Sequence, residues 1–162
     1  RAMAFACCST DGIVQQTADG ATAALEVRPS TLGGVAGQGL FTRVAIPAGC
    51  TVCEYSGETV RTAEAIRLED KSYLMRLGPQ TYVDARAAPE VLARYINDCR
   101  NPAVYNVRFE KRPDEGRALV ISTRAVCAGE ELFVDYGKWY WASLKPQRIA
   151  PALAVGILQA VE

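Results

Sequence analysis

Two tyrosines that each follow an acidic residue are the groups in this sequence best suited to chemistry. Glu54-Tyr55 and Asp135-Tyr136 both end apolar runs, and Thr42-Arg43 and Thr123-Arg124 precede them with the same spacing of 81 residues. A phenolic hydroxyl can donate and accept a hydrogen bond, so each tyrosine can orient a polar reacting group. The chain contains no histidine, which excludes a Ser-His-Asp hydrolase and any imidazole general base.

A polar turn and a glycine pair offer groups that can bind a ligand. The cluster Asn97-Asp98-Cys99-Arg100-Asn101-Pro102 should stop a short helix predicted over residues 89–96, because such side chains bond to the backbone. Gly37-Gln38-Gly39-Leu40-Phe41 places two glycines where the backbone can approach a ligand closely. Taken alone, this pair also fits a flexible hairpin. A Rossmann site is a poor alternative, because no βαβ unit surrounds the glycines.

The order of these motifs resembles that of the SET-domain protein lysine methyltransferases. The signature of that family reads roughly Arg-Phe-Ile-Asn-His-Ser and then Glu-Leu-x-Phe-Asp-Tyr-Gly. Here the corresponding stretches are Arg94-Tyr95-Ile96-Asn97-Asp98 and Glu131-Leu132-Phe133-Val134-Asp135-Tyr136-Gly137. The resemblance covers about residues 25–141 and implies an α+β, mostly β SET (β-clip) fold. Such a fold has short antiparallel strands in small sheets, and its terminal segment passes through a loop near Asn97 as a pseudoknot.

Strand and turn signals agree with one domain of this kind. Two strands are predicted, VYNVRFEK (residues 104–111) and RALVIST (117–123), with the turn RPDEG between them. SYLMRL is predicted to pair with TYVDAR across Gly78-Pro79-Gln80. A short exposed helix is predicted over 61–70 and a C-terminal helix from Pro151. We expect residues 1–23 to be a leader or weakly ordered cap, 24–142 the SET domain, and 143–162 a helical extension packed on the core.

The resemblance implies S-adenosyl-L-methionine as the cofactor. Asn97 would hold its amino group through the side chain, and the next residue would serve mainly through its backbone. That next residue is Asp98 where the family has histidine, which is the largest departure. The aromatic cluster Lys138-Trp139-Tyr140-Trp141 is expected near the adenine. The expected cofactor-binding residues are Gly37, Gln38, Gly39, Leu40, Tyr73, Arg94, Asn97, Asp98, Trp139 and Trp141.

The resemblance also assigns the catalytic groups, because the two tyrosines line the target-lysine channel in that family. Methyl transfer needs a neutral amine in line with the methyl carbon and needs no strong base, since desolvation beside a sulfonium lowers the lysine pKa. We expect Tyr136, Tyr55 and Tyr105 to be catalytic, and Val134, Tyr55 and Tyr105 to line the channel. Val134 lacks the ring or hydroxyl that narrows the channel elsewhere in the family, so multiple methylation is favoured unless Tyr105 fills the space.

The charges and cysteines narrow the partners further. Eighteen basic and eighteen acidic residues cancel, so no global field favours nucleic acid or a membrane. The cysteines lack the spacing of a four-ligand zinc site, so we expect reduced thiols, an intracellular location and no metal. Many SET enzymes close the site with a cysteine-rich zinc knot. No cysteine follows Cys127, so the aromatic cluster and the tail are expected to replace it.

The sequence thus predicts a protein-lysine N-methyltransferase. By family analogy its partner would be a protein with a target lysine, most simply a histone tail, and its location nuclear. The chain starts at Arg1 without an initiator Met, so a larger parent protein is possible. A non-catalytic SET-like module that binds a peptide or cofactor is an alternative, and Asp98 is the feature in its favour. A second alternative is an interaction domain that uses Trp139, Tyr140 and Trp141.

Overall fold

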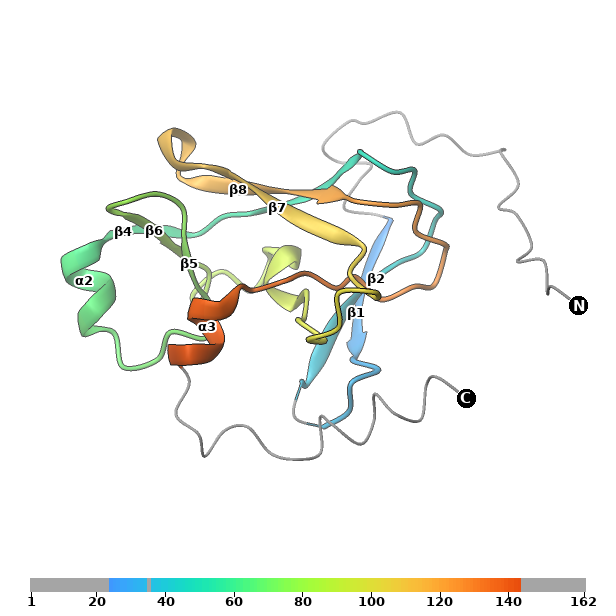
Figure 1. The fold of residues 1–162 in the computed structure, drawn as a ribbon, viewed down its shortest axis with the longest axis horizontal. Helices are drawn as coiled ribbons and strands as arrows, with labels where there is room; N and C mark the ends of the chain where they lie inside the picture. Colours follow the sequence, from blue (N-terminus) through green and yellow to red (C-terminus); the bar gives the residue numbers. More distant parts are fainter. Residues whose placement is uncertain (1–23, 35, 144–162) are drawn as a thin grey trace, which may run out of the picture.

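The computed structural model describes residues 24–34 and 36–143, which form three small antiparallel sheets and short helical turns (Figure 1). The first sheet is a hairpin of β1 (Leu25–Pro29) and β2 (Gln38–Thr42), in which Val27 pairs with Leu40. The predicted α+β, mostly β fold is confirmed. The small sheets place apolar side chains on both sides of β2, where Leu40 is fully buried.

The second sheet has the order β3-β8-β7, so β8 is its central strand. It contains β3 (Thr51–Tyr55), β7 (Val107–Arg112) and β8 (Arg117–Ser122). The 3-10 turn η2 (Pro113–Glu115) joins β7 to β8, and Gly116 follows in the left-handed region that glycine adopts without strain. Ala118 and Val120 of the central strand are fully buried, as its alternating apolar pattern requires.

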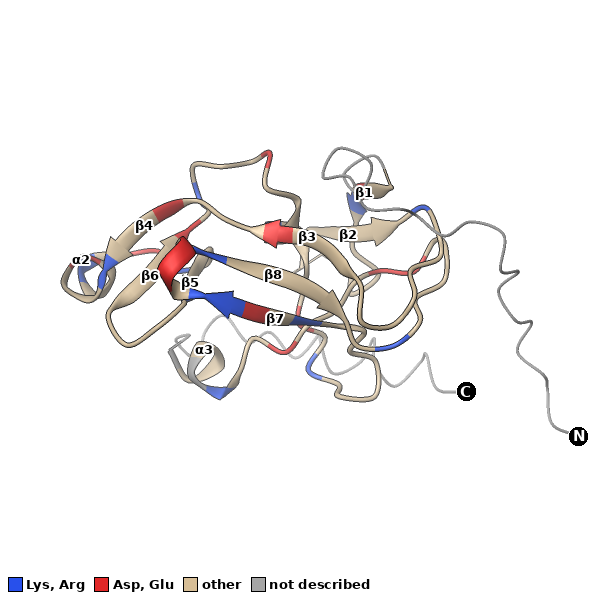
Figure 2. Cartoon of the chain, turned by 90° about the horizontal axis from the view of Figure 1, so that it is seen from above, with Lys and Arg blue, Asp and Glu red and all other residues tan. Residues whose placement is uncertain are grey.

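The third sheet, of order β4-β6-β5, lies at the end of the molecule that carries α2 (Figure 1). Its strands are β4 (Glu58–Arg61), β5 (Leu74–Arg76) and β6 (Thr81–Asp84), and α2 (Thr62–Arg67) follows β4. The Glu64 carboxylate accepts a hydrogen bond from the Arg61 backbone at 2.9 Å, which caps the start of this helix. Acidic and basic residues are interspersed along the chain (Figure 2), in keeping with its balanced composition.

Residues 130–134 form no long strand, yet three parts of the fold hold their backbone. Leu132 N donates to Leu40 O at 2.7 Å, and Val134 N donates to Asn97 O at 3.0 Å. From the other side, Asn106 N donates to Phe133 O at 3.1 Å. The segment is therefore bonded to both ends of the loop that runs from Asn97 to Asn106, which is the arrangement expected of the pseudoknot.

The repeated motif detected in the sequence corresponds to a local twofold arrangement. Ile46 and Val126 exchange both backbone hydrogen bonds at 2.9 Å, and the glycine turns pair reciprocally, Gly49 N with Ser122 O and Gly129 N with Thr42 O. These hydrogen bonds make position 42 equivalent to position 122, a spacing of 80 residues. The Thr-Arg pairs in the sequence are 81 residues apart, so the structural equivalence differs from the sequence repeat by one residue in this region.

Several predicted element boundaries were wrong. The helix expected over 89–96 is a 3-10 turn, η1 (Leu92–Tyr95), and the helix expected over 61–70 is limited to α2. Tyr105 precedes β7 instead of lying within it, and the run that ends at Tyr136 makes isolated bridges at Glu131 and Phe133. The expected leader and the helix from Pro151 lie outside the described residues, so the domain boundaries stay predictions.

The cysteines of residues 24–34 and 36–143 are spread over several parts of the fold. Cys50, Cys53 and Cys99 are free thiols, and burial raises the pKa of the Cys53 thiol to about 12. Over the same residues no group of His, Cys, Asp and Glu side chains is arranged to hold a metal ion. No helix in this part of the chain has the length and apolar character needed to cross a membrane.

Candidate active site

Tyr136 is fixed at both ends by the turn that follows η1. Its hydroxyl donates to the carbonyl of Ile96 at 2.6 Å, and its backbone N–H donates to Asp98 Oδ2 at 3.0 Å. Burial raises the pKa of this hydroxyl well above its usual range, and the neighbouring Tyr140 and Tyr55 raise it further. The hydroxyl therefore remains protonated at neutral pH. Since its proton is directed to Ile96, its oxygen lone pairs are left to accept hydrogen bonds.

Tyr55, the last residue of β3, is held in the same way. Its hydroxyl donates to the carbonyl of Tyr73 at 2.7 Å, and its ring meets Phe109 edge-to-face with 5.8 Å between centroids. The side chain is buried, and burial is also the main cause of the raised pKa of Tyr55. The site therefore contains two protonated tyrosines, each with its proton committed to a backbone carbonyl.

The helix α3 (Lys138–Ser143) packs aromatic rings against Tyr136 (Figure 1 shows the helix). The Tyr140 ring meets Tyr136 edge-to-face at 4.6 Å, and Trp141 lies nearly parallel to Tyr136 at 6.3 Å with an interplanar angle of 19°. Such contacts bury large apolar rings and exclude water from one side of Tyr136. The prediction for the Trp139 side chain lies outside the described residues.

Asn97 reaches across to the glycine-containing strand. Its Nδ2 donates to the carbonyl of Gln38 at 2.9 Å and to Glu131 Oε1 at 3.4 Å. Both amide protons are thus used, which fixes the orientation of the amide. Among the described residues no donor reaches Asn97 Oδ1, so this oxygen can accept a hydrogen bond from a ligand.

Glu131 is a buried carboxylate behind Asn97 and Gly39. Its oxygens accept hydrogen bonds from Ser30 Oγ at 2.7 Å, from Thr31 N at 2.8 Å and from Thr31 Oγ1 at 2.6 Å. A methyl group on Gly39 would overlap Glu131 Oε1, so any larger residue here would displace the carboxylate from its hydrogen bonds. The glycine pair therefore serves two needs, because Gly37 adopts a positive φ of 68° while Gly39 admits the carboxylate.

Arg94 supplies a cation close to Tyr55 and Tyr73. Its guanidinium stacks on the Tyr73 ring at 4.0 Å, and one terminal nitrogen donates to the carbonyl of Arg86. Its Nε is buried and has no hydrogen-bond partner among the described residues. The positive charge of Arg94 lowers the pKa of Tyr55, although less than burial raises it.

Asp98 lies inside the protein and accepts hydrogen bonds from four donors. Oδ1 binds Arg100 N at 2.7 Å and the Tyr105 hydroxyl at 2.6 Å. Oδ2 binds Tyr136 N at 3.0 Å and Trp141 Nε1 at 2.7 Å. These bonds occupy its side chain, so only the backbone of Asp98 is available to a cofactor.

Comparison with known proteins was consistent with these motifs. The family model described as "SET domain" matches residues 37–137, a stretch that contains the glycine pair, the Asn97 turn and Tyr136. The chain belongs to the SET-domain family. The match spans more than half of the sequence and ends just before α3.

The curated relatives of this SET domain have names that refer to one activity. The mouse protein named "Histone-lysine N-methyltransferase EHMT1" is 38% identical over 112 residues, which is 65% of this chain and 9% of that protein. "Histone-lysine N-methyltransferase, H3 lysine-4 specific" of Mycosarcoma maydis is 35% identical over 60% of this chain and 7% of its own length. "Histone-lysine N-methyltransferase MEDEA" of Arabidopsis thaliana is 34% identical over 63% of this chain. The chain thus spans less than a tenth of the first two relatives.

The predicted site residues of the SET domain lie in three groups. Gln38, Gly39 and Asn97 form one continuous network with Glu131, and Tyr136, Asp98, Tyr105 and Trp141 form another. Tyr55, Tyr73 and Arg94 form the third, through the Tyr55 hydroxyl bond to Tyr73 O and the stacking of Arg94 on the Tyr73 ring. Leu40 lies in the core instead, where it is fully buried and contributes a backbone carbonyl to Leu132. Val134 is likewise almost completely buried.

Some functional groups were not identified from the sequence. Glu131 belongs to a quoted motif but had no assigned role, and Phe109 was regarded only as a strand residue. The acceptor role of the Ile96 and Tyr73 backbone carbonyls cannot be predicted from residue type, because every residue has such a carbonyl. The one available signal was Gly39, because a glycine within a buried strand indicates that another group approaches closely.

Proposed function

We propose that this SET domain is an S-adenosyl-L-methionine-dependent protein-lysine N-methyltransferase. The observation that carries the proposal is the pair of tyrosine hydroxyls bound to carbonyls, Tyr136 to Ile96 and Tyr55 to Tyr73. Two such oxygens can accept hydrogen bonds from an amine without removing a proton from it. Membership of the SET family and the names of the relatives support the same activity.

The residues present fit the amino-acid end of the cofactor. That end carries an ammonium and a carboxylate. Asn97 Oδ1 accepts no bond within the described protein, so it suits the ammonium, and the buried Nε of Arg94 suits the carboxylate. When bound, the cofactor supplies a methyl group on a sulfonium. We assign Gly37, Gln38, Gly39, Asn97 and the Asp98 backbone to its pocket, with Tyr73 beside Arg94 and Trp141 near the adenine.

The tyrosines would orient the substrate amine. A neutral lysine amine has two N–H donors and one lone pair, and hydrogen bonds to Tyr136 and Tyr55 would use the donors. The lone pair then points away from both hydroxyls, toward the methyl group. Tyr140 and Trp141 keep water from one side of Tyr136, which favours the neutral amine because desolvation lowers the pKa of lysine.

The target lysine most consistent with the relatives is on a histone. EHMT1 and the Mycosarcoma maydis protein carry histone-lysine methyltransferase names, and we extend this substrate class and a nuclear location to the present chain as proposals. A non-catalytic module that binds a peptide or the cofactor is the competing function. Asp98 was the feature that favoured it, but its side chain binds Tyr136 and so supports the catalytic arrangement.

Two measurements test the proposed function together. Calorimetry with S-adenosyl-L-methionine should give binding heat that Asn97→Ala weakens, and transfer of a radiolabelled methyl group to core histones should depend on Tyr136. A binding module would bind the cofactor with no transfer to any histone or lysine peptide. An interaction domain would give no binding heat at all.

A further inference from the structure

Asp98 connects the catalytic tyrosine to the helix that covers it. Three hydrogen bonds join residues 134–136 to residues 96–98, namely Val134 N to Asn97 O, Tyr136 N to Asp98 Oδ2 and the Tyr136 hydroxyl to Ile96 O. The first and third use backbone carbonyls, which any residue supplies. The second needs a side-chain acceptor at position 98.

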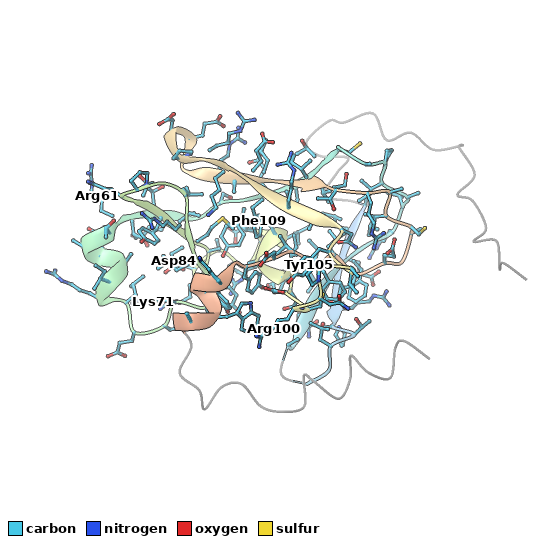
Figure 3. All side chains as sticks on the ribbon, viewed as in Figure 1. Arg61, Lys71, Asp84, Arg100, Tyr105 and Phe109 are labelled. Carbon is cyan, nitrogen blue, oxygen red and sulfur yellow. The ribbon has the colours of Figure 1, made fainter. Side chains whose placement is uncertain are left out.

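The same oxygen of Asp98 also accepts the Trp141 indole N–H at 2.7 Å. Trp141 is five positions after Tyr136 and lies within α3, so one carboxylate oxygen holds both ends of this short segment. The indole ring stacks on Tyr136, and the Arg100 guanidinium lies over the Trp141 ring at 4.8 Å from its centroid. Figure 3 shows Arg100 and Tyr105 on the same side of the fold as α3.

The Asp98 carboxylate has few free acceptor sites for further hydrogen bonds. A carboxylate offers about four lone-pair sites, and four donors occupy them. The residue is only 5% exposed, and the ion pairs between described residues do not include it. A buried carboxylate held by neutral donors is costly to perturb, because removal of one acceptor leaves several donors unpaired.

We propose that Asp98 is a positioning residue that holds α3 over Tyr136, so that the aromatic cover and the catalytic hydroxyl keep one arrangement. This inference rests on the proposed function for its effect on turnover, but the contact between Asp98 and α3 can be tested without any activity. Asparagine at position 98 could not accept all four hydrogen bonds. Its amide has only one acceptor oxygen, and its NH2 group would face donors that now bind the second carboxylate oxygen.

The test compares Asp98→Asn with Asp135→Asn in the full 162-residue chain. Both changes remove one negative charge near Tyr136, but Asp135 is exposed and only its Oδ1 accepts a bond, from Gly137 N at 2.7 Å. The chain has two tryptophans, so the indole region of a nitrogen-15 NMR spectrum contains two signals, and Trp141→Phe assigns one of them. Hydrogen exchange of that signal reports directly on the bond to Asp98.

Asp98→Asn should accelerate exchange of the Trp141 indole proton at least about tenfold, since its acceptor is weakened. It should lower kcat at least about tenfold while the KM for S-adenosyl-L-methionine changes less than about threefold. Asp135→Asn should do neither. Equal indole exchange in Asp98→Asn and wild type would overturn the proposal, and so would equal losses of kcat in the two variants. If the wild type transfers no methyl group, the proposed function fails, and indole exchange still decides whether Asp98 holds α3.

A second variant covers the case in which Asp98→Asn does not fold. Trp141→Phe removes one donor, keeps a ring beside Tyr136 and leaves three donors on Asp98. Trypsin should then cut after Lys138 in α3 at least about tenfold faster than in wild type, with the cut after Arg67 in α2 as the internal reference. An unchanged ratio of the two cuts would contradict the proposed anchoring.

Discussion

The Tyr136 hydroxyl donates a hydrogen bond to the backbone carbonyl of Ile96 at 2.6 Å, across 40 residues of sequence. The acceptor is a backbone atom, so the contact depends on how the terminal segment crosses the Asn97 loop rather than on the side chain at position 96. The protonated hydroxyl is thereby directed inward. Its oxygen remains available to a substrate amine, which is the basis of the catalytic role we assign to Tyr136.

Asn97→Ala should weaken binding of S-adenosyl-L-methionine by more than the ~1 kcal/mol of an ordinary hydrogen bond, because a charged ammonium loses its acceptor. Calorimetry on the folded variant measures this directly. Asn101→Ala is a suitable control, since the Asn101 side chain bonds only to Ala103 N in its own turn. Unchanged affinity in a folded Asn97→Ala protein would refute the assigned pocket.

Glu131→Gln should lower the stability of the fold and the affinity for the cofactor together. Glutamine has one acceptor oxygen, so its NH2 group would meet the Ser30 and Asn97 donors or those of Thr31. A buried mismatch of this kind costs about 1–3 kcal/mol. Thermal unfolding measures the first effect and calorimetry the second.

The control for Glu131→Gln is Glu130→Gln, which changes the neighbouring carboxylate paired with Arg124 at a more exposed site. Exposed ion pairs contribute about 0–1 kcal/mol, so this variant should unfold near the wild-type temperature. Equal destabilisation by the two changes would show that the hydrogen bonds of Glu131 contribute no more to stability than the exposed ion pair of Glu130.

Alkaline pH should destabilise the fold through its buried tyrosines. Burial raises the pKa of Tyr55, Tyr105 and Tyr136, so the folded protein keeps protons that the unfolded chain loses. This stabilisation is fully present below the unfolded pKa of about 10 and declines as the pH rises beyond it. The Cys53 thiol acts in the same direction from a lower pH, since its ordinary pKa of 9.0 lies below that of tyrosine and burial raises it to about 12.

Thermal unfolding between about pH 8 and pH 11 checks this dependence. Tyr136→Phe should reduce the slope of stability against pH, whereas Tyr82→Phe, in a half-buried strand position with no hydroxyl bond in the described structure, should not. A slope that is the same in Tyr136→Phe and wild type would contradict the role of burial at Tyr136.

The number of methyl groups added should depend on Val134 and Tyr105. Val134 has no hydroxyl to hold a blocking water, and the Tyr105 hydroxyl is bonded to Asp98 Oδ1 at 2.6 Å. We therefore expect di- or trimethyllysine from wild type, measured by mass spectrometry of a modified peptide. A strictly monomethyl product that becomes trimethyl in Tyr105→Phe would assign the restriction to Tyr105 instead.

The parts of the site that the sequence revealed are those carried by short motifs. Asn97 and Tyr136 were found because helix-stopping polar residues and an acid-tyrosine pair before a glycine are visible within a few positions. The class of the fold was implied by the resemblance to the SET family, and short alternating apolar runs, which a small antiparallel sheet requires, agreed with it. These signals are local, so tertiary structure did not alter them.

The remaining parts depend on contacts that no local pattern contains. Glu131 is bonded to Ser30 and Thr31, about 100 residues away, and a buried acidic residue is rarely expected from its type alone. The expected helix over 89–96 became the single turn η1, because a short helix gains few hydrogen bonds for the cost of its first turn. Asp98 was expected to act through its backbone, and its partners Tyr105, Tyr136 and Trp141 emerge only when the chain is folded.

The most direct test of the account is methyl transfer by Tyr136→Phe. We predict that this variant keeps its fold and binds S-adenosyl-L-methionine nearly as wild type does, while transfer to a histone substrate falls at least about 100-fold, as expected for the loss of a positioning hydroxyl. Tyr55→Phe should show a milder loss of the same kind, and Tyr82→Phe should retain wild-type transfer. If Tyr136→Phe instead lost melting temperature and activity together, Tyr136 would be a core residue. If it transferred methyl groups at the wild-type rate, the catalytic assignment would be wrong.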